Sequence, residues 1–402
     1  MGSSSRIRTR ELVGMMSMVM ALSAMAIDFM TPAFGEIRVH YQLGPESTAA
    51  ALIITFFFLG EVAQVIYGPL SDRFGRLPVF RLGFAVYGVG SLASAFAPTF
   101  GFMLGARFLW GLGAAALQVS ASAIIRDRFR GDEMARIMSI TFSIFLIVPV
   151  FAPLAGAALL SATSWQMVFA FPALLAVLMF VWSFRLAESR PESNIVALEL
   201  PAIVRAARFV LGNRTTRRYT VGAMLLFAAF SSFLSSFERV IGEIFGRPGL
   251  FPLAFGAMTA VAAAVMLGNG RLVNHIGAKR SSLWMLAVNL AVAAVLLALT
   301  IPGVPPLGVT LGLLTVVLAV NTAASIDFGS LALEPMGEQA GMAAAFYGSV
   351  YVGGGALVGS FIDRLLVDTL TPWAAALLLS AGGALLLVPG PRSVRAERPI
   401  EV

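Results

Sequence analysis

The chain has 402 residues, of which 58% are hydrophobic and only 12% are charged, whereas about a quarter of the residues of a soluble domain are charged. This composition excludes an ordinary soluble protein and predicts a chain embedded in a lipid bilayer. Cysteine is absent and histidine occurs only at His40 and His275, which excludes disulfides and the usual thiolate or paired-histidine metal sites. We therefore expect no metal and no other cofactor.

Stretches of about 20 mostly apolar residues, the length that crosses a bilayer, recur twelve times along the chain. They cover roughly 12–37, 48–68, 79–98, 102–125, 137–160, 165–185, 219–240, 252–271, 281–301, 306–328, 341–362 and 371–389. The long polar interruption after the sixth span separates two sets of six. We expect an all-α membrane protein with two pseudo-symmetric six-helix bundles, at 1–188 and 218–402, and a cytoplasmic linker at 189–217.

The net charge of +7 could suggest a nucleic-acid partner, but the distribution of the basic residues argues against one. Of 28 Lys and Arg residues, 23 lie in segments that share one side of the membrane with both termini; the other five are Arg38, Arg239, Arg247 and Arg364 on the far side and Arg107 within the fourth span. Basic residues concentrate on the cytoplasmic side of membrane proteins, so both termini are predicted to be cytoplasmic. The first hydrophobic run is too long for a signal peptide and is interpreted as a retained span.

A polar run between the second and third spans reads G-P-L-S-D-R-F-G-R-L-P-V-F-R over residues 68–81, and we interpret it as a loop. Asp72 is expected to accept hydrogen bonds at a helix N-terminus. Arg73 and Arg76 are expected to pair with an acid of a neighbouring helix end, with Asp127 as the candidate. Such a cluster would hold the two halves together on the inner side, although the run could also simply shape a tight turn.

A similar pattern returns in the second half. The residues at equal offsets are Gly68, Leu70, Asp72, Arg73 and Gly75 in the first copy, and Gly270, Leu272, Asn274, His275 and Gly277 in the second. Gly75 permits a positive φ that a Cβ would resist. Duplicated halves place a substrate near the bilayer midplane and alternate its access by rocking; chance spacing among 39 glycines is the other interpretation.

Four ionisable residues are candidates for proton coupling because they fall within predicted spans: Asp28, Glu61, Arg107 and Asp327. Such a group costs roughly 2.5–3.5 kcal/mol on insertion scales, so it normally faces a cavity or a partner. Asp28 is the first candidate for a proton carrier, with a structural hydrogen bond as the alternative. For Glu61 three roles are open: a second proton site, a group that attracts cations, or a partner of Arg107. Arg107 requires an acceptor and could be a structural lock, and Asp327 could equally be solvated or capping.

Pro149 and Pro153 in the fifth span each remove a backbone donor, which bends or loosens the helix. Gly156, one turn further on, lets another helix approach closely. The three glycines at 353–355 in the eleventh span are interpreted in the same way, as a site of close packing or flexibility.

Together these segments resemble a known family. The run at 68–76, Asp28-Phe-Met-Thr-Pro32, the segments 107–113 and 149–156, Ser164-Trp165-Gln166 and the segment 333–337 are similar to signatures of the major facilitator superfamily. Over essentially its whole length the chain resembles the drug:proton antiporters, most of all the bicyclomycin and chloramphenicol exporters of the Bcr/CflA group. Glu61 departs from that pattern. The resemblance implies the major facilitator fold, a role for Arg107 in proton transfer, and antiport from the Pro149, Pro153 and Gly156 signature.

We therefore expect proton-coupled efflux of a small amphipathic substrate by alternating access, in a monomer of the bacterial cytoplasmic (inner) membrane. Candidate walls of the substrate cavity are Phe57, Trp110, Phe142, Met224, Phe230, Phe233 and Tyr347. The alternatives are a symporter or exporter of a sugar, organic acid or other metabolite, and more remotely a membrane-embedded receptor or enzyme. We find neither a catalytic constellation nor a large extramembrane domain, and we expect no enzymatic activity.

Overall fold

The computed structural model describes residues 8–44, 48–190, 208, 212–366 and 369–389. Every regular element within these residues is a helix. Eleven helical segments of the described chain are long and apolar enough to cross a membrane, and a twelfth apolar helix, Thr371–Leu387, is 17 residues long. The chain is therefore a multi-pass membrane protein, and the twelve predicted spans are confirmed at their expected places.

The first bundle contains the six spans before residue 190. Its elements are α1 (Thr9–Asp28), η1 (Thr31–Ala33), α2 (Phe34–His40), η2 (Thr48–Ala51), α3 (Leu52–Glu61), α4 (Gln64–Phe74), α5 (Arg76–Ala95), α6 (Phe100–Arg128), α7 (Gly131–Ala162) and α8 (Trp165–Ser183). The strongest packing within it joins α5 to both α6 and α8, α3 to α6, and α1 to α7.

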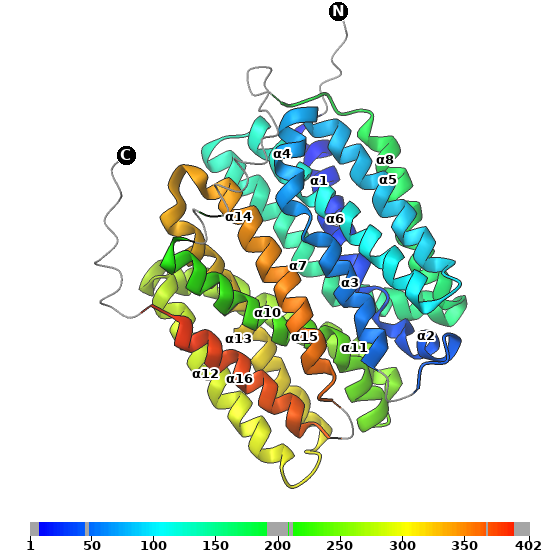
Figure 1. Ribbon diagram of the computed structural model, residues 1–402, viewed down its shortest axis with the longest axis vertical. Coiled ribbons are helices and arrows are strands. Elements are labelled where there is room, and N and C mark those ends of the chain that lie inside the picture. The colour runs from blue at the N-terminus through cyan, green and yellow to red at the C-terminus, as the bar shows by residue number, and fades with distance from the viewer. Residues whose placement is uncertain (1–7, 45–47, 191–207, 209–211, 367–368, 390–402) are drawn as a thin grey trace, which may run out of the picture.

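The second bundle contains the remaining six spans. Its elements are α10 (Arg214–Arg239), the π-helix η4 (Val240–Ile244), η5 (Pro248–Leu250), α11 (Phe251–Ile276), α12 (Ala278–Thr300), α13 (Leu307–Leu333), η6 (Glu334–Gln339), α14 (Ala340–Ser349), the π-helix η7 (Val350–Gly354), α15 (Gly355–Asp363) and α16 (Thr371–Leu387). Figure 1 shows this bundle, which runs from green to red, beside the first bundle, which runs from blue through cyan to the green of α8. Most of the predicted linker lies outside the described residues.

The polar run at 68–81 is not the loop that the sequence suggests. Helix α4 continues to Phe74 and α5 begins at Arg76, so only Gly75 separates them. Gly75 has a φ of 103°, and Gly277, at the corresponding join of α11 and α12, has a φ of 83°. Because only glycine adopts such angles readily, one residue suffices to reverse the chain, and the internal repeat extends to the backbone geometry.

Proline and a helix break leave two backbone carbonyls without their usual helical donors. Pro32 cannot donate to the Asp28 carbonyl, which instead accepts from Thr31 Oγ1 at 2.8 Å; α1 therefore ends at Asp28 and does not merely bend. In the second span, α3 and α4 are separated at Val62, whose carbonyl oxygen lies 2.8 Å from Ser349 Oγ of the other bundle. A side-chain hydroxyl lies within hydrogen-bond distance of the carbonyl oxygen in both cases, and the Val65 N–H also approaches the Val62 carbonyl at 3.4 Å.

Close helix packing in the first bundle depends on glycine. A Cβ at Gly111 of α6 would lie 2.0 Å from the Phe57 carbonyl oxygen of α3, whereas a Cβ at Gly105 of the same helix would meet nothing within 4 Å. We expect Gly111→Ala to force α3 and α6 apart and to destabilise the protein by roughly 1–3 kcal/mol, as overpacking does. Gly105→Ala is the matched control. Melting temperatures in detergent should fall only for Gly111→Ala; equal values for both variants would contradict this packing.

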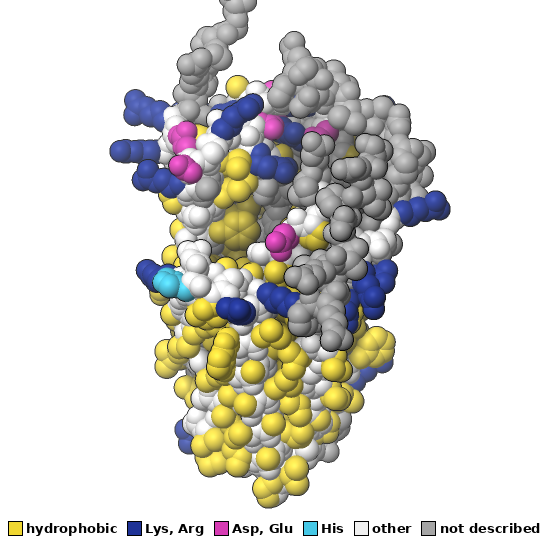
Figure 2. Space-filling model, turned by 90° about the vertical axis from the view of Figure 1, so that its left-hand side faces the viewer, with side chains coloured by type: hydrophobic (Ala, Val, Ile, Leu, Met, Phe, Trp, Pro, Cys, Tyr) yellow, Lys and Arg dark blue, Asp and Glu magenta, His cyan; other side chains and the backbone are white. Residues whose placement is uncertain are grey.

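The two ends of the molecule differ. We call the end where α4 meets α5, and where α6 ends with Arg126 and Arg128, the basic end; α2 and η4 lie at the opposite end. Figure 2 shows a hollow in the molecule with hydrophobic side chains in its interior and Lys and Arg side chains around its rim. At the opposite end the two bundles are in contact, through α2 and α10.

Candidate functional site

An ion-pair cluster joins the two bundles at the opposite end. Arg38 Nη2 of α2 lies 2.9 Å from Glu238 Oε2 of α10 and 3.4 Å from Glu243 Oε1 of η4. Arg239 Nε also donates to Glu243 Oε2, at 3.0 Å. Arg38 and Glu238 are only 7% and 9% exposed, so their charges are largely shielded from solvent. We call Arg38, Glu238, Arg239 and Glu243 the interbundle ion-pair cluster.

The proline segment of α7 lies where this helix contacts both bundles. Because Pro153 has no N–H, the Pro149 carbonyl lacks its helical donor, and Thr259 Oγ1 of α11 lies 3.4 Å from it. A Cβ at Gly156 would lie 2.0 Å from the carbonyl oxygen of Phe29, the residue that follows α1. The three residues of the predicted antiporter signature thus lie at a three-way helix contact that includes the bundle interface.

Arg107 is fully buried in the first bundle and connects three helices. Its Nη1 donates to the Ala26 carbonyl of α1 at 2.9 Å, and its Nε donates to the Ile53 carbonyl of α3 at 3.2 Å. The guanidinium carbon lies 4.7 Å from the Phe57 ring and 4.6 Å from the Trp110 ring. Its Nη2 has no hydrogen-bond partner within the described residues.

The two acids of the first bundle lie in different surroundings. Asp28 is 5% exposed, two residues beyond the Ala26 carbonyl that binds Arg107, and no described side chain donates to its carboxyl group. Glu61 is the last residue of α3, is 8% exposed and accepts from Gln118 Nε2 of α6 at 3.3 Å. The predicted Glu61–Arg107 pair is not a direct salt bridge, although the positive charge of Arg107 acts on Glu61. We call Glu61, Arg107 and Gln118 the buried polar cluster; the Asp28 carboxyl group forms no described contact with it.

Asp327 belongs to a separate group in the second bundle. It is 3% exposed, and its Oδ1 accepts from Asn269 Nδ2 of α11 at 2.8 Å. Ser281 of α12 donates in turn to Asn269 Oδ1. The second carboxyl oxygen of Asp327 has no partner within the described residues. The structure therefore places Asp327 with α11 and α12, away from the buried polar cluster.

The predicted gating residues form a cluster inside the first bundle. Arg76 Nε lies 2.8 Å from Asp127 Oδ2 of α6, and Arg76 Nη1 pairs with Asp72. The expectation that Asp72 caps a helix N-terminus is wrong, because α4 continues to Phe74 and places Asp72 in its last turn. Arg73 lies with its guanidinium carbon 5.3 Å from the Phe74 ring, and within the described residues it forms no pair with Asp127.

The segment after α8 completes this cluster and was not predicted. Glu188 accepts from the backbone N–H groups of Arg76 and Leu77 at the start of α5, while Arg190 donates to the Asp72 and Arg73 carbonyls at the end of α4. Burial alone would raise the pKa of Glu188, but four backbone N–H donors hold the pKa below its ordinary value. These charges complement the two helix ends.

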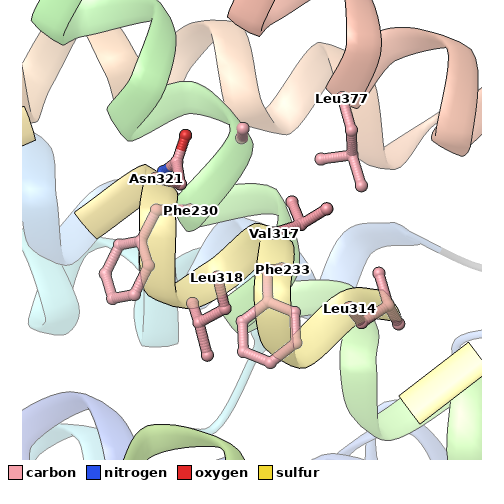
Figure 3. A pocket seen from close by; sticks show the side chains of 8 residues that line it. Phe230, Phe233, Leu314, Val317, Leu318, Asn321 and Leu377 are labelled. Atoms are coloured by element: carbon pink, nitrogen blue, oxygen red, sulfur yellow. The ribbon is translucent and has the colours of Figure 1, made fainter. Parts of the chain in front are cut away.

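The predicted cavity residues differ widely in their exposure. Phe57, Trp110 and Phe233 are buried, and Phe142 is 57% exposed. Met224, Phe230 and Tyr347 are partly exposed. Phe230 and Phe233 border a void of about 10 Å³ in the second bundle, shown in Figure 3 with Asn321 beside it. That void holds about one water molecule, so it is too small for a drug-sized substrate.

Several interacting residues gave little signal in the sequence. Arg38 and Arg239 were two of only four basic residues on the predicted far side, and basic residues that lie there against the general bias could have been examined as gate candidates. Glu238 interrupts the end of an apolar span and is a comparable signal. Gln118 and Glu188 carried none, because their partners are 57 and 112 residues away along the chain.

The twelve apolar helices of the described chain, which form two contacting bundles with ionisable side chains buried inside them, define a multi-pass membrane transporter. The family model of the Major Facilitator Superfamily matches residues 16–360, and the chain belongs to this superfamily. It is 27% identical over 371 residues to the bicyclomycin resistance protein homolog of Haemophilus influenzae, covering 90% of each chain. It is 28% identical over 359 residues to the chloramphenicol resistance protein of Pseudomonas aeruginosa, covering 87% of this chain and 80% of the relative.

Solved structures share the same architecture. A nucleoside transporter superposes with a TM-score of 0.71 and 14% identity, covering 94% of this chain and 98% of the other. A D-xylose-proton symporter superposes with a TM-score of 0.70 and 13% identity, with the same coverage. At such low identities the similarity establishes the fold alone, and the substrate has to be argued from this chain.

Proposed function

We propose that this protein exports small amphipathic drugs in exchange for protons, by alternating access across the cytoplasmic membrane of a bacterium. The observation that carries the proposal is the Asp28 carboxyl group, which is buried in the first bundle and accepts no hydrogen bond from a described side chain. The relatives named for bicyclomycin and chloramphenicol resistance support a drug as the substrate. The basic end is then the cytoplasmic side, and the transporter acts as a monomer.

In this mechanism the form open to the outside takes a proton on Asp28, or on a partner coupled to it, while releasing the drug. The form open to the inside loses the proton as the next drug binds. The two ligands must therefore weaken each other's binding, and this coupling is reciprocal. One charge moving down about 100 mV supplies about 2.3 kcal/mol, which sustains a gradient of roughly fortyfold. Exchange of a single proton is enough for useful export.

The conformation with the hollow at the basic end corresponds to the inward-open form. The interbundle ion-pair cluster keeps the outer end shut, and the ion pairs of Arg76 with Asp72 and Asp127 remain within the first bundle. In the outward-open form, Arg73 and Arg76 would face the second bundle across the closed inner side. The apolar interior of the hollow suits amphipathic molecules, since apolar burial contributes roughly 25 cal/mol per Å².

Drug-dependent proton release tests the function directly. The purified protein, in weakly buffered detergent solution, is mixed with chloramphenicol, bicyclomycin and a series of amphipathic cations while the pH is followed. We expect at least one compound to release protons in a saturable manner. Sugars and organic acids are the comparison set. Proton release or uptake with those compounds alone would favour a metabolite transporter and contradict drug export.

A further inference from the structure

A groove between α5 and α8 opens on the outer surface of the first bundle. Its volume is about 470 Å³, and no polar side chain lines it. Val89, Leu174 and Val177 on its walls are between 55% and 59% exposed, so in a membrane the groove faces lipid. Gly88 deepens it, because a Cβ there would have only Ala176 within 4 Å, at 3.8 Å. The volume lies within the range of ligand sites in proteins.

The groove ends at a positive charge. Arg81 lies on α5 in the same helical stripe as Gly88, two turns nearer the basic end. Its guanidinium carbon lies 4.4 Å from the Phe184 ring at the end of α8, and its Nη2 donates to the Ser183 carbonyl at 3.3 Å. Its Nε is buried without a partner.

No carboxylate of the described chain pairs with Arg81. The neighbouring Arg185, in contrast, is matched by Glu11 at 3.1 Å. Arg81 therefore presents a guanidinium whose charge is not neutralised, next to an apolar channel about 12 Å long if α5 rises by about 1.5 Å per residue from Phe84 to Leu92.

We propose that this groove binds an anionic phospholipid, with its phosphate at Arg81 and an acyl chain along Val89 and Val177. Guanidinium groups bind phosphate through directed, charge-assisted hydrogen bonds. Basic sites between membrane helices hold the headgroups of anionic lipids in this manner. The height fits as well, because the Phe184 ring lies against Arg81, Trp182 is at the same end of α8, and aromatic side chains gather at the headgroup level. The proposal does not depend on which substrate is transported.

Native mass spectrometry of the full chain tests the proposal. The protein is equilibrated with equimolar phosphatidylglycerol and phosphatidylcholine that carry identical acyl chains. We expect bound phosphatidylglycerol to exceed phosphatidylcholine about fivefold, since one basic residue near the headgroup contributes about 1 kcal/mol. Arg81→Gln should remove the preference and Arg81→Lys should keep most of it. Arg280→Gln is the matched control, since this exposed arginine lies at the basic end of the other bundle.

Gly88→Leu tests the acyl-chain part separately, because it fills the groove and leaves Arg81 in place. We expect it to lower binding of both lipids to a similar degree. Equal binding of the two lipids to the wild-type protein, or an unchanged preference in Arg81→Gln, would overturn the headgroup assignment. Unchanged lipid binding in Gly88→Leu would contradict the assignment of the groove as the acyl-chain site. A variant is compared with the wild-type protein only if its melting temperature and its monodispersity match those of the wild type.

Discussion

Asp28→Asn is expected to abolish uphill accumulation of drug in proteoliposomes to which a pH step is applied, while downhill drug movement continues. Asparagine has nearly the same size and keeps a carbonyl oxygen, but it cannot exchange a proton. The driving force of about 2.3 kcal/mol per charge at 100 mV then has no route into the transport cycle. The fortyfold gradient expected of the wild-type protein should fall to about one.

Glu36→Gln is the matched control for this variant. Glu36 lies in the same span as Asp28, in the first turn of α2, but it is exposed, and its neutralisation should leave accumulation unchanged. Glu61→Gln distinguishes the two buried acids: loss of accumulation in Glu61→Gln but not in Asp28→Asn would assign the proton to Glu61. If Asp28→Asn still concentrates drug as the wild type does, Asp28 is not the proton carrier.

Arg38→Gln is expected to shift the protein toward the form that is open at the opposite end. The substitution leaves Glu238 buried without its partner, and breaking a buried pair in this way costs about 3–5 kcal/mol. The cost falls on the closed form only, so the equilibrium between the two forms should move by roughly two to three and a half orders of magnitude. Transport should slow because the inward-open form becomes scarce.

Distances between spin labels measure this shift. The sequence has no cysteine, so introduced pairs are the only labelled sites. Phe96→Cys with Ile301→Cys spans the opposite end, and Phe74→Cys with Trp284→Cys spans the basic end; all four positions are at least 56% exposed. Arg38→Gln should lengthen the first distance and shorten the second. The exposed Arg247 provides the control Arg247→Gln. If the distances in Arg38→Gln are unchanged, the interbundle ion-pair cluster does not control the opening of this end.

The arrangement of spans was predictable from the sequence because the bilayer fixes the length of each apolar segment. Close packing was predictable where it depends on glycine: Gly156 does meet another helix, and Gly353 lies against Val62 of the first bundle. The join at Gly75 was placed correctly, but its length was not, because the polar residues around it continue two helices instead of forming a loop.

The partners of the buried charges could not be predicted. Arg107 binds the carbonyls of Ala26 and Ile53, and since every residue has a carbonyl group, the sequence does not indicate which ones will accept. Arg38 and Glu238 are separated by 200 residues, and only the packing of the two bundles brings them together. The positions of ionisable groups were therefore visible in the sequence, while their pairing required the fold.

The hydroxyl groups of Ser349 and Thr259, which meet backbone carbonyls of the first bundle at 2.8 Å and 3.4 Å, have a consequence for how the substrate range can change. Such neutral bonds contribute only about 1 kcal/mol each, and water can replace them when the halves part. The two bundles are thus joined by ion pairs at the opposite end and by weak, neutral hydrogen bonds elsewhere along their interface. We therefore expect substitutions in the hollow to change the substrate range and to have little effect on the free-energy difference between the inward-open and outward-open forms.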